Sequence, residues 1–534
     1  MPNISSRYVP PTGPLGADLL IIGEAPGEQE DKELQPFVGP TGEILTRLLE
    51  QAGYSRANAR ITNICNYRPA NNDFSLLEDS DELSQGIKDV KEYIQKHPPK
   101  MILILGGKPL EYLLDKYGIS NYRGTPLSYN GIRVIATLHT AVLFRDYHDY
   151  PIILSDICRC INHINKPFPT YHTSFLLKPT GLTLEEAIDE IRSAKKLAID
   201  IESVKDSTHI ICVGFATSAS RAIVIHNPSY DGLDPTFQSA ITRCLDTPAE
   251  KYLHNGNFDK IMLAQNGFIF DKITWDTMVA THVMEPELPY GLDFLVSTYT
   301  FLPCYWAGVA SGEEKAWSKK SSKRESIYEY NAYDCIATYM ITEMQQNEMS
   351  KDLRRVMDFK MECLPLAEEM STTGFVVDYD RRAELREHVI QSITNSARLV
   401  NMLTGKIVNP RSPKFKEFVY GDLGLPVRKK RDGGITTDED AMIASITYCK
   451  AERDKLRTPS LRLEWDKKIA ILKSFMNITG MLKMLSSYID ISIPSDGRVK
   501  SMFRPAATET SRWAAGLFVD GSGFNAQTLP REKV

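Results

Sequence analysis

Three short apolar runs constrain the fold of the first third of the chain more than any other sequence feature. They stand at 18–23 (DLLIIG), 101–107 (MILILGG) and 131–139 (GIRVIATLH), with helical patterns between them. Strands that are apolar along their whole length are typical of parallel sheets, because helices cover both faces of such a sheet. The sequence therefore predicts an α/β domain with a buried parallel sheet.

Two further blocks follow a segment rich in residues that interrupt helices and strands. The segment KPFPTYHTSFLLKPTG at 166–181 contains three prolines and a glycine, and is predicted to be a linker. A helix that Thr183 can cap opens the second block, and two paired strands are expected at 196–204 and 210–217. The third block is predicted to be helical to about 370 and again over 437–490.

Length and charge are compatible with several globular domains. The chain has 534 residues and a formal net charge of −5, and this length fits roughly three to four domains of about 150 residues. Residues 351–534 carry 31 Lys and Arg against 24 Asp and Glu, whereas the rest of the chain is acidic. Such a basic excess fits nucleic-acid binding, although on charge alone an uneven scatter of surface charge is the better explanation.

The nine cysteines and the lack of long apolar segments indicate a cytoplasmic protein. The cysteines form no CxxC pair, which is typical of reduced thiols rather than of disulfides or a zinc ribbon. The first residues, MPNISSRYVPPTGPLG, include no apolar signal segment, and no run of about 18 apolar residues follows. We therefore expect no contact with a membrane.

Acidic residues at matched spacings give the second block its chemistry. Asp200 and Glu202 lie two residues apart on a predicted strand, so their carboxylates share one face. Asp259 follows in HNGNFD, and Tyr330 and Asp334 are four apart on one helix face. Four converging acids would bind two divalent cations, because Mg²⁺ and Mn²⁺ prefer oxygen ligands. Two such ions assist phosphodiester hydrolysis by activating water and stabilising the leaving oxygen.

In order and spacing these motifs resemble the DEDD superfamily of 3′–5′ exonucleases, in the subtype that uses a tyrosine. The matches are DxE at 200–202, NxxxD at 255–259 and YxxxD at 330–334, and Asp276 in WDTMVA matches the proofreading domains of family A DNA polymerases. The resemblance implies a ribonuclease H-like fold in which Asp200, Glu202 and Asp334 hold one metal ion. It also implies that Asp259 supports the second ion with Asp200, and that Tyr330 orients the attacking water.

The third block resembles the thumb and the opening of the palm of family A DNA polymerases. Phe415 stands where the family usually has Gln, and Ser511 where it usually has Gly. The matching pieces, in family order, are GFVVD at 374–378, NPRSPK at 409–414, LGLPV at 423–427, TTDEDAM at 436–442, SSYID at 486–490, DGRVKSMF at 496–503, TETSR at 508–512 and FNAQTLPR at 524–531.

Basic and polar residues of this block are expected to contact primer-template DNA. A run of four basic residues suits phosphate contacts, which position a duplex without reading its sequence, although a solvated loop is the alternative. The resemblance implies that the arginine of TETSR reaches the minor groove near the primer terminus, and that two polar residues of FNAQ contact DNA beside it. The full set is Arg428, Lys429, Lys430, Arg431, Arg512, Asn525 and Gln527.

No polymerase carboxylates follow these motifs in the sequence. Nucleotidyl transfer needs palm carboxylates for its two metal ions, and a cationic fingers helix for the incoming triphosphate. The last residues, FNAQTLPREKV at 524–534, correspond to the segment just before the first palm aspartate of the family. We therefore expect a chain that does not polymerise by itself. The alternatives are a fragment, an exon product, a natural exonuclease-only product, or a split-gene subunit that works with a separately encoded palm-and-fingers chain.

The first block resembles the family 4 branch of the uracil-DNA glycosylase superfamily. Such enzymes extrude a base from the stack and read it in a pocket. The resemblance implies that Phe37 stacks on the base and that Asn63 reads its polar edge. It implies further that His139 stabilises the anionic leaving base, with Glu24 and Asp31 near the attacking water. The matching pieces are GEAPGEQED at 23–31, PFVGPTG at 36–42, ITNICNYRPANN at 61–72, LILGGKPLEYLL at 103–114, YRG at 122–124 and TLHTAVLFR at 137–145.

Two departures from this family affect the expected chemistry. Family members usually bind an iron–sulfur cluster through four cysteines, one of them in a CRPP motif whose cysteine is Tyr67 here, and no CxxC precedes Asp18. We therefore expect no cluster. Thr140 replaces the proline that usually follows the histidine. An active glycosylase and a base-binding module without catalysis both stay open.

Together these patterns predict an α/β multidomain protein. Residues 1–165 are expected to form a glycosylase-like α/β/α sandwich, 182–350 the exonuclease domain, and 351–534 a mostly helical thumb with the start of the palm. The combination resembles the N-terminal part of a bacteriophage replicative polymerase, located in the host cytoplasm and acting on primer-template and single-stranded 3′ ends. The alternatives are a DNA-binding accessory subunit of a split polymerase and a standalone uracil-repair exonuclease.

Overall fold

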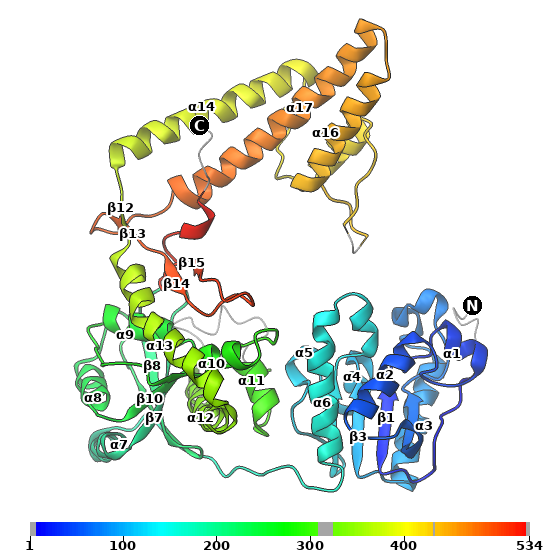
Figure 1. Ribbon diagram of the computed structural model, residues 1–534, viewed down its shortest axis with the longest axis vertical. Coiled ribbons are helices and arrows are strands. Elements are labelled where there is room, and N and C mark those ends of the chain that lie inside the picture. The colour runs from blue at the N-terminus through cyan, green and yellow to red at the C-terminus, as the bar shows by residue number, and fades with distance from the viewer. Residues whose placement is uncertain (1–6, 308–323, 431–432, 530–534) are drawn as a thin grey trace. The chain divides into compact units, whose positions relative to one another are not determined.

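A computed structural model describes residues 7–307, 324–430 and 433–529, and divides the chain into two compact units (Figure 1). The first unit comprises Met1–Glu368 and Arg504–Ala514, and the second comprises Glu369–Phe503 and Ala515–Val534. Both are mixtures of helices and strands, so the predicted α/β multidomain class is confirmed. In the part of the chain that is described, no helix is both long enough and apolar enough to cross a membrane.

The first unit begins with a three-layer α/β/α sandwich. Its sheet has the strand order β2-β1-β3-β5-β4, in which β4 is antiparallel to β5 and the other pairs are parallel. The three predicted apolar runs form β1, β3 and β5, as expected. The strands are β1 Leu19–Gly23, β2 Ala59–Asn63, β3 Met101–Leu105, β4 Leu127–Tyr129 and β5 Ile132–Thr137.

Alternate residues of β1 enter two separate cores, which explains why the whole strand is apolar. Leu19 and Ile21 belong to a cluster with side chains of α2 (Pro40–Gln51) and α6 (Tyr150–Asn162). Leu20 and Ile22 belong to a cluster on the other side with α3 (Asp81–Lys96) and α4 (Gly107–Leu114). Because successive strand residues point to opposite faces, both faces of this strand need apolar side chains.

Shorter elements connect the layers of the sandwich. They are α1 Glu28–Glu33 and α5 Ile119–Tyr122, with the short 3₁₀ turns η1 Arg56–Asn58, η2 Ala70–Asn72, η3 Phe74–Leu77, η4 Thr140–Phe144 and η5 Tyr147–Asp149. Both α1 and η4 follow the carboxyl ends of parallel strands. Ligands bind at these strand ends in open α/β sheets.

A second sheet, of mixed direction, follows in the same unit with the order β11-β10-β7-β8-β9-β6. The predicted strand pair is confirmed as β7 and β8, which are antiparallel, whereas β10 is parallel to β7. The segment expected to be a linker contains β6, which pairs in parallel with β9 at the sheet edge. The strands are β6 Ser174–Leu177, β7 Lys196–Ser203, β8 Ile210–Ser218, β9 Arg221–His226, β10 Glu250–Leu253 and β11 Trp275–Asp276.

The helices of this region include α12, which contacts β7, β8 and β9. The first helix begins at Gly181 rather than after Thr183, because Thr180 is its N-cap and its backbone N–H donates to Thr183 Oγ1 at 3.2 Å. The helices are α7 Gly181–Ser193, α8 Pro235–Leu245, α9 Gly256–Gln265, α10 Thr277–Met284, α11 Leu292–Tyr299, α12 Arg324–Glu348 and α13 Lys351–Thr373.

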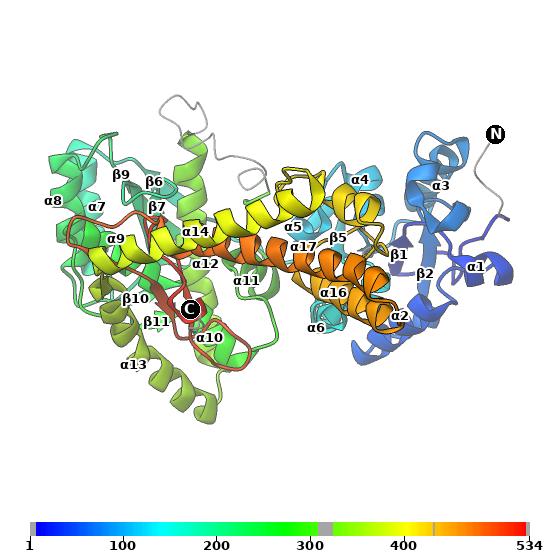
Figure 2. The same cartoon turned by 90° about the horizontal axis from the view of Figure 1, so that it is seen from above.

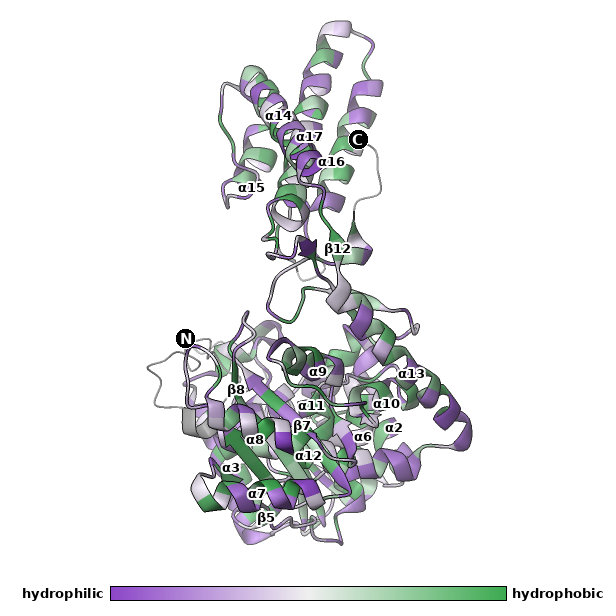
Figure 3. Cartoon of the chain, turned by 90° about the vertical axis from the view of Figure 1, so that its left-hand side faces the viewer, coloured by the Kyte–Doolittle hydropathy of each residue, from purple (hydrophilic) through white to green (hydrophobic). Residues whose placement is uncertain are grey.

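The second unit is mostly helical. Its core holds side chains from α14 (Tyr379–Thr404), α16 (Glu439–Asp454) and α17 (Pro459–Met484), and α14 runs beside α17 (Figure 2). All three helices carry both hydrophilic and hydrophobic residues (Figure 3). The helix α14 was not predicted from the sequence pattern, which indicated helices only to about 370 and over 437–490. The remaining elements are α15 Phe415–Glu417, the π-helices η6 Phe418–Asp422 and η7 Leu485–Ile489, η8 Ala526–Thr528, and the strands β12 Phe375–Val376, β13 Arg498–Val499, β14 Met502–Arg504 and β15 Ala514–Gly516.

Substitution of Gly42 in α2 is expected to destabilise the sandwich. A Cβ there would lie 1.7 Å from the backbone oxygen of Phe37, and backbone cannot move aside as the end of a flexible side chain can. We expect Gly42→Ala to lower the free energy of unfolding by about 1–3 kcal/mol, although alanine is normally favoured in helices. Gly107→Ala in α4 is the control, because no atom lies within 4 Å of its Cβ position. Urea unfolding of the full chain measures both, and equal effects would contradict the prediction.

Candidate functional site: a carboxylate cluster and a base-sized cavity

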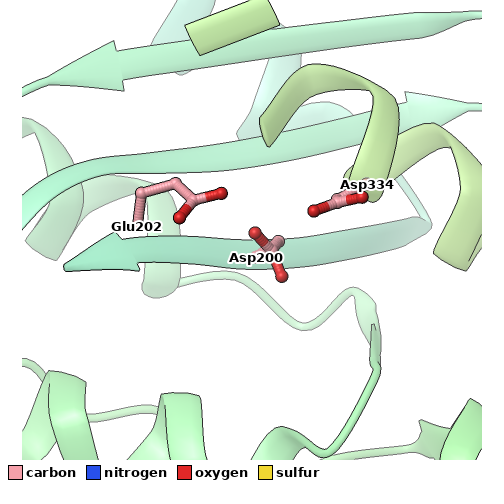
Figure 4. Close-up of side chains that lie close together, drawn as sticks. All are labelled: Asp200, Glu202 and Asp334. Atoms are coloured by element: carbon pink, nitrogen blue, oxygen red, sulfur yellow. The ribbon is translucent and has the colours of Figure 1, made fainter. Parts of the chain in front are cut away.

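Three of the predicted metal ligands converge in the second part of the first unit. Asp200 and Glu202 lie on the same face of β7, and Asp334 comes from α12 (Figure 4). Their carboxylate oxygens lie within 4.8 Å of one another. Alternation along β7 and the packing of α12 against that strand bring these side chains together, as the two-residue spacing predicts.

The fourth predicted ligand, Asp259, lies on α9 beside this cluster. It is buried, and its Oδ1 accepts the backbone N–H of Ile201 at 3.2 Å. The charge of Asp259 is, after burial, the largest contribution that raises the pKa of Asp200. Asp259 is therefore an electrostatic neighbour of the cluster, although it is not one of the three residues whose oxygens converge within 4.8 Å.

The loop that leads into α9 is held by Asp276, the last residue of the short strand β11. Its carboxylate accepts the N–H groups of Asn255 at 3.2 Å and of Gly256 at 2.7 Å, and it caps α10 through two further N–H groups. Burial nevertheless raises its pKa. Asp276 therefore fixes the turn before Asp259.

Burial and mutual repulsion dominate the electrostatics of the cluster. Burial raises the pKa values of Asp200, Glu202 and Asp334, and the neighbouring carboxylates raise them further. The negative charge of Asp334 is the main cause of the raised pKa of Tyr330, so this phenol stays protonated. Like charges this close cannot all ionise without a compensating cation.

Neutral donors offset part of this repulsion. Asn331 Nδ2 donates to Asp200 Oδ2 at 2.7 Å, and the phenol of Tyr305 donates to Asp334 Oδ1 at the same distance. Tyr330 also forms a hydrogen bond with Asp334. Neither Asn331 nor Tyr305 belongs to the motifs from which the site was predicted. For Asn331, its position next to Tyr330 on a helix that bears a metal ligand was a usable signal.

A glycine in β8 makes room for this arrangement. Gly214 lies opposite Asp200 in the antiparallel pair, and a Cβ there would lie 2.2 Å from Asn331 Oδ1. Any larger residue would push the Asn331 amide away from the Asp200 carboxylate. The possible metal ligands of the cluster are carboxylate oxygens that carry excess negative charge in a mostly buried site. Such ligands fit a hard divalent cation such as Mg²⁺ or Mn²⁺.

The sandwich carries a second candidate site at the carboxyl ends of its parallel strands. A cavity of about 240 Å³ is lined there by Glu24, Phe37 and His139, together with Glu30 and Asn72 among others. Phe37 is buried and adopts a positive φ of 54°, which is strained for an aromatic residue and is typical of functional loops. Three of the five residues predicted for a base pocket therefore line one cavity.

His139 is held in a neutral form. Burial lowers its pKa, and Glu24 raises it by a smaller amount. Its Nδ1 accepts the backbone N–H of Ala141 at 3.2 Å, so the remaining ring proton lies on Nε2. Glu24 in turn accepts the N–H of Gly107 at 3.1 Å, at the start of α4. The histidine can thus donate one hydrogen bond from Nε2.

The other two predicted pocket residues lie outside the cavity lining. Asn63 lies beside Phe37, since a Cβ on Gly23 would be 2.5 Å from both Asn63 Oδ1 and the tip of the Phe37 ring. The Nδ2 of Asn63 is buried and finds no acceptor among the described residues. Asp31 lies on α1 and accepts the backbone N–H of Arg7 at 2.9 Å.

Iron–sulfur chemistry does not fit this region. A cluster of the expected type needs four cysteine ligands, and residues 1–165 contain three cysteines, Cys65, Cys158 and Cys160. The side chain of Tyr67, at the position of the expected ligand, instead packs edge-on against Tyr8 with ring centroids 5.6 Å apart. We therefore derive no step through a cluster.

The predicted DNA contacts of the third block fall in different places. Lys429 and Lys430 are exposed in a turn closed by a bridge between Lys429 and Ile435, whereas Arg428 is half-buried and donates to the Ala444 carbonyl at 3.4 Å. Arg431 lies outside the described residues. Arg512 is exposed and belongs to the first unit, whereas Gln527 is exposed in the second unit and Asn525 Oδ1 accepts its N–H at 3.0 Å.

Comparisons with known proteins match two domain families to this chain. Residues 10–192 match the model of the uracil DNA glycosylase superfamily, and residues 180–350 match a 3′–5′ exonuclease model. The type-4 uracil-DNA glycosylase of Thermotoga maritima is 34% identical over 159 residues, which is 29% of this chain and 81% of that protein. The chain belongs to the uracil-DNA glycosylase superfamily. This family 4 glycosylase-like domain precedes a 3′–5′ exonuclease domain in the same chain.

DNA polymerases are also among the relatives of this chain. DNA polymerase I of a Synechocystis strain is 23% identical over 291 residues, which is 52% of this chain and 27% of the relative. The chain spans about a third or less of the length of such polymerase relatives. A solved structure, the POL domain of Pol1 from M. smegmatis in complex with DNA primer-template and dNTP, matches 67% of this chain and 56% of that chain, at 19% identity and a TM-score of 0.46.

Divalent cations are expected to stabilise the exonuclease domain. A carboxyl group with a raised pKa in the folded state contributes stability below its ordinary pKa of about 4, and loses it as the pH rises through the folded-state value. The ionised cluster therefore costs stability near neutral pH, and a bound cation reverses this cost. At 100 times its Kd a cation adds about 2.7 kcal/mol. Thermal unfolding of the full chain with and without Mg²⁺ or Mn²⁺ at neutral pH measures this gain.

Charge removal provides the matching control for that measurement. Asp200→Asn removes one repelling charge, so we expect a higher Tm without metal and a smaller increase on adding the cation. Asp246→Asn alters an acid of the same domain whose side chain is 85% exposed, and should change neither value. A wild-type Tm that does not respond to either cation would contradict the assignment of this cluster as a metal site.

Proposed function

We propose that residues 182–350 degrade DNA from its 3′ end by hydrolysis that depends on two divalent ions, Mg²⁺ or Mn²⁺. The observation that carries this proposal is the convergence of Asp200, Glu202 and Asp334 within 4.8 Å, with Asp259 beside them. The first three residues would hold one ion, and Asp259 with Asp200 would hold the second. When bound, such ions activate water and stabilise the leaving oxygen.

The protein's own groups complete this site. The hydroxyl of Tyr330 stays protonated because of the charge of Asp334 and donates its proton to that carboxylate, so its oxygen can accept a hydrogen bond from the attacking water and so orient it. Asn331 holds one oxygen of Asp200 through its amide, which fixes the orientation of that carboxylate. Asp276 keeps the preceding loop in place for Asp259.

In the wider proposal this nuclease proofreads for a family A DNA polymerase of bacteriophage type. The polymerase I relatives and the thumb-like motifs of the third block support it. The set Arg428, Lys429, Lys430, Arg431, Arg512, Asn525 and Gln527 would then contact primer-template DNA in the host cytoplasm. The alternative is an accessory subunit that supplies DNA-binding surfaces to a separately encoded palm-and-fingers chain.

Loss of the paired strand acids should abolish the nuclease. Replacing both Asp200 and Glu202 by alanine removes two of the three converging ligands, and we expect no metal-dependent shortening of a single-stranded oligonucleotide labelled at its 5′ end. Asp246→Ala, on the surface of the same domain, should keep wild-type rates. Degradation by the double variant at the wild-type rate would refute the proposal.

We further propose that the first domain excises uracil from DNA. Two observations favour this second activity: the neutral His139 in a cavity of base size, and the buried Asn63 Nδ2 beside Phe37, for which the described part of the chain offers no acceptor. Asn63 Nδ2 can donate to a carbonyl oxygen of the base. As the glycosidic bond breaks and water adds to C1′, the base leaves as an anion that His139 Nε2–H can stabilise by a hydrogen bond.

An alkali-cleavage assay separates excision from binding. We expect wild-type protein to create alkali-labile sites in an oligonucleotide containing uracil, and His139→Ala to reduce the rate by about 10²–10³-fold. His148→Ala, an exposed histidine in the same domain, is the control. Retained binding of the uracil oligonucleotide without any cleavage would contradict excision, and would indicate a base-binding module.

A further inference from the structure

The phenol of Tyr305 lies against a predicted metal ligand, although no motif marks this residue. It follows α11, and its hydroxyl donates to Asp334 Oδ1 at 2.7 Å. The ring stacks on Tyr333, with centroids 4.8 Å apart and planes 12° apart. It also packs edge-on against Trp306 at 5.1 Å and against Tyr330 at 5.7 Å. Rings on several sides therefore hold the hydroxyl in place.

The position of this hydroxyl has a chemical consequence for Asp334. A carboxylate on a helix can rotate about its last bond, and a donor fixed on one oxygen limits that rotation. The hydrogen bond also draws negative charge from a group that faces Asp200 and Glu202 within 4.8 Å. A phenol has an ordinary pKa near 10, so it remains a neutral donor at physiological pH.

We propose that Tyr305 is a positioning residue of the exonuclease metal site, which orients Asp334 so that its carboxylate meets the cation. This inference rests on the proposed function of the carboxylate cluster. The role differs from that of Tyr330, which is expected to act on the attacking water. Hydrogen-bond partners behind metal ligands fix the orientation of those ligands, and their loss typically costs 10–100-fold in metal affinity or activity.

Three variants of the full chain test this role. Tyr305→Phe keeps the ring and removes the hydroxyl. Tyr333→Phe is the matched control, because it removes a hydroxyl from the ring stacked on Tyr305. Tyr305→Leu removes ring and hydroxyl together, and so reports what the packing alone contributes. Calorimetric titration with Mn²⁺ gives the Kd, thermal unfolding without metal reports the fold, and shortening of a single-stranded oligonucleotide gives kcat.

We expect Tyr305→Phe to raise the Kd for Mn²⁺ at least about 10-fold while its metal-free Tm stays within about 2 °C of wild type. Its nuclease rate should recover partly when the Mn²⁺ concentration is raised. Tyr333→Phe should bind Mn²⁺ within about twofold of wild type. An unchanged Kd for Mn²⁺ in Tyr305→Phe would overturn the proposal. If only Tyr305→Leu lost Mn²⁺ affinity, the packing of the ring and not the hydroxyl would be the cause, and the proposal would be wrong.

The readouts also separate this proposal from the proposed function. A wild-type chain that binds Mn²⁺ through the cluster but leaves DNA intact would refute the exonuclease. The Kd comparison between Tyr305→Phe and Tyr333→Phe would still decide the role of Tyr305 in that case.

Discussion

Repulsion between carboxylates is the interaction on which the exonuclease domain is organised. Asp200, Glu202 and Asp334 bring like charges within 4.8 Å of one another in a mostly buried setting. Coulomb repulsion at such distances is strong where water is scarce. Two neighbouring side chains, Asn331 and Tyr305, reduce this repulsion by donating hydrogen bonds to the carboxylates, and neither side chain is charged. The fold thus holds an arrangement that is unfavourable until a cation arrives.

In both sites, glycine residues leave space for other parts of the chain to approach closely. In the exonuclease, Gly214 leaves the space that Asn331 fills. In the glycosylase-like sandwich, Gly23 lets Asn63 and the Phe37 ring approach the strand, and Gly42 lets the Phe37 backbone turn back on α2. In both places a glycine on a regular element admits a functional side chain from elsewhere in the chain.

The sequence was most informative where a periodic pattern and a chemical requirement coincide. The apolar strands of the sandwich, the DxE pair on β7 and the four-residue spacing of Tyr330 and Asp334 were all predictable, because strand and helix periods alone set those faces. Long-range contacts were not. Tyr305 lies on a segment between helices, and its contact with Asp334 depends on the tertiary packing of this segment against α12, whose Tyr330 and Tyr333 rings pack on the Tyr305 ring. For α14, polar residues on most faces weakened the helical pattern.

Short strands also could not be predicted from the sequence pattern. The four residues of β6 lie between prolines in a stretch that reads as a linker, and they become a strand because β9 offers unpaired backbone groups beside them. The predicted start of α7 was inexact for a similar reason. Both Thr180 and Thr183 can form capping hydrogen bonds, and the sequence alone does not show which of them is the N-cap.

The position of β6 has a consequence for how the glycosylase-like domain and the exonuclease domain can be separated. By family similarity Ser174–Leu177 falls within the glycosylase match, 10–192, and before the exonuclease match, 180–350. By hydrogen bonding it completes the exonuclease sheet at the edge of β9. A cut at the family boundary would therefore remove β6 from the outer side of β9, which would keep only β8 as its partner, and would leave an open edge that favours aggregation. The exonuclease sheet therefore begins before residue 180, at Ser174, within the residues that match the glycosylase family.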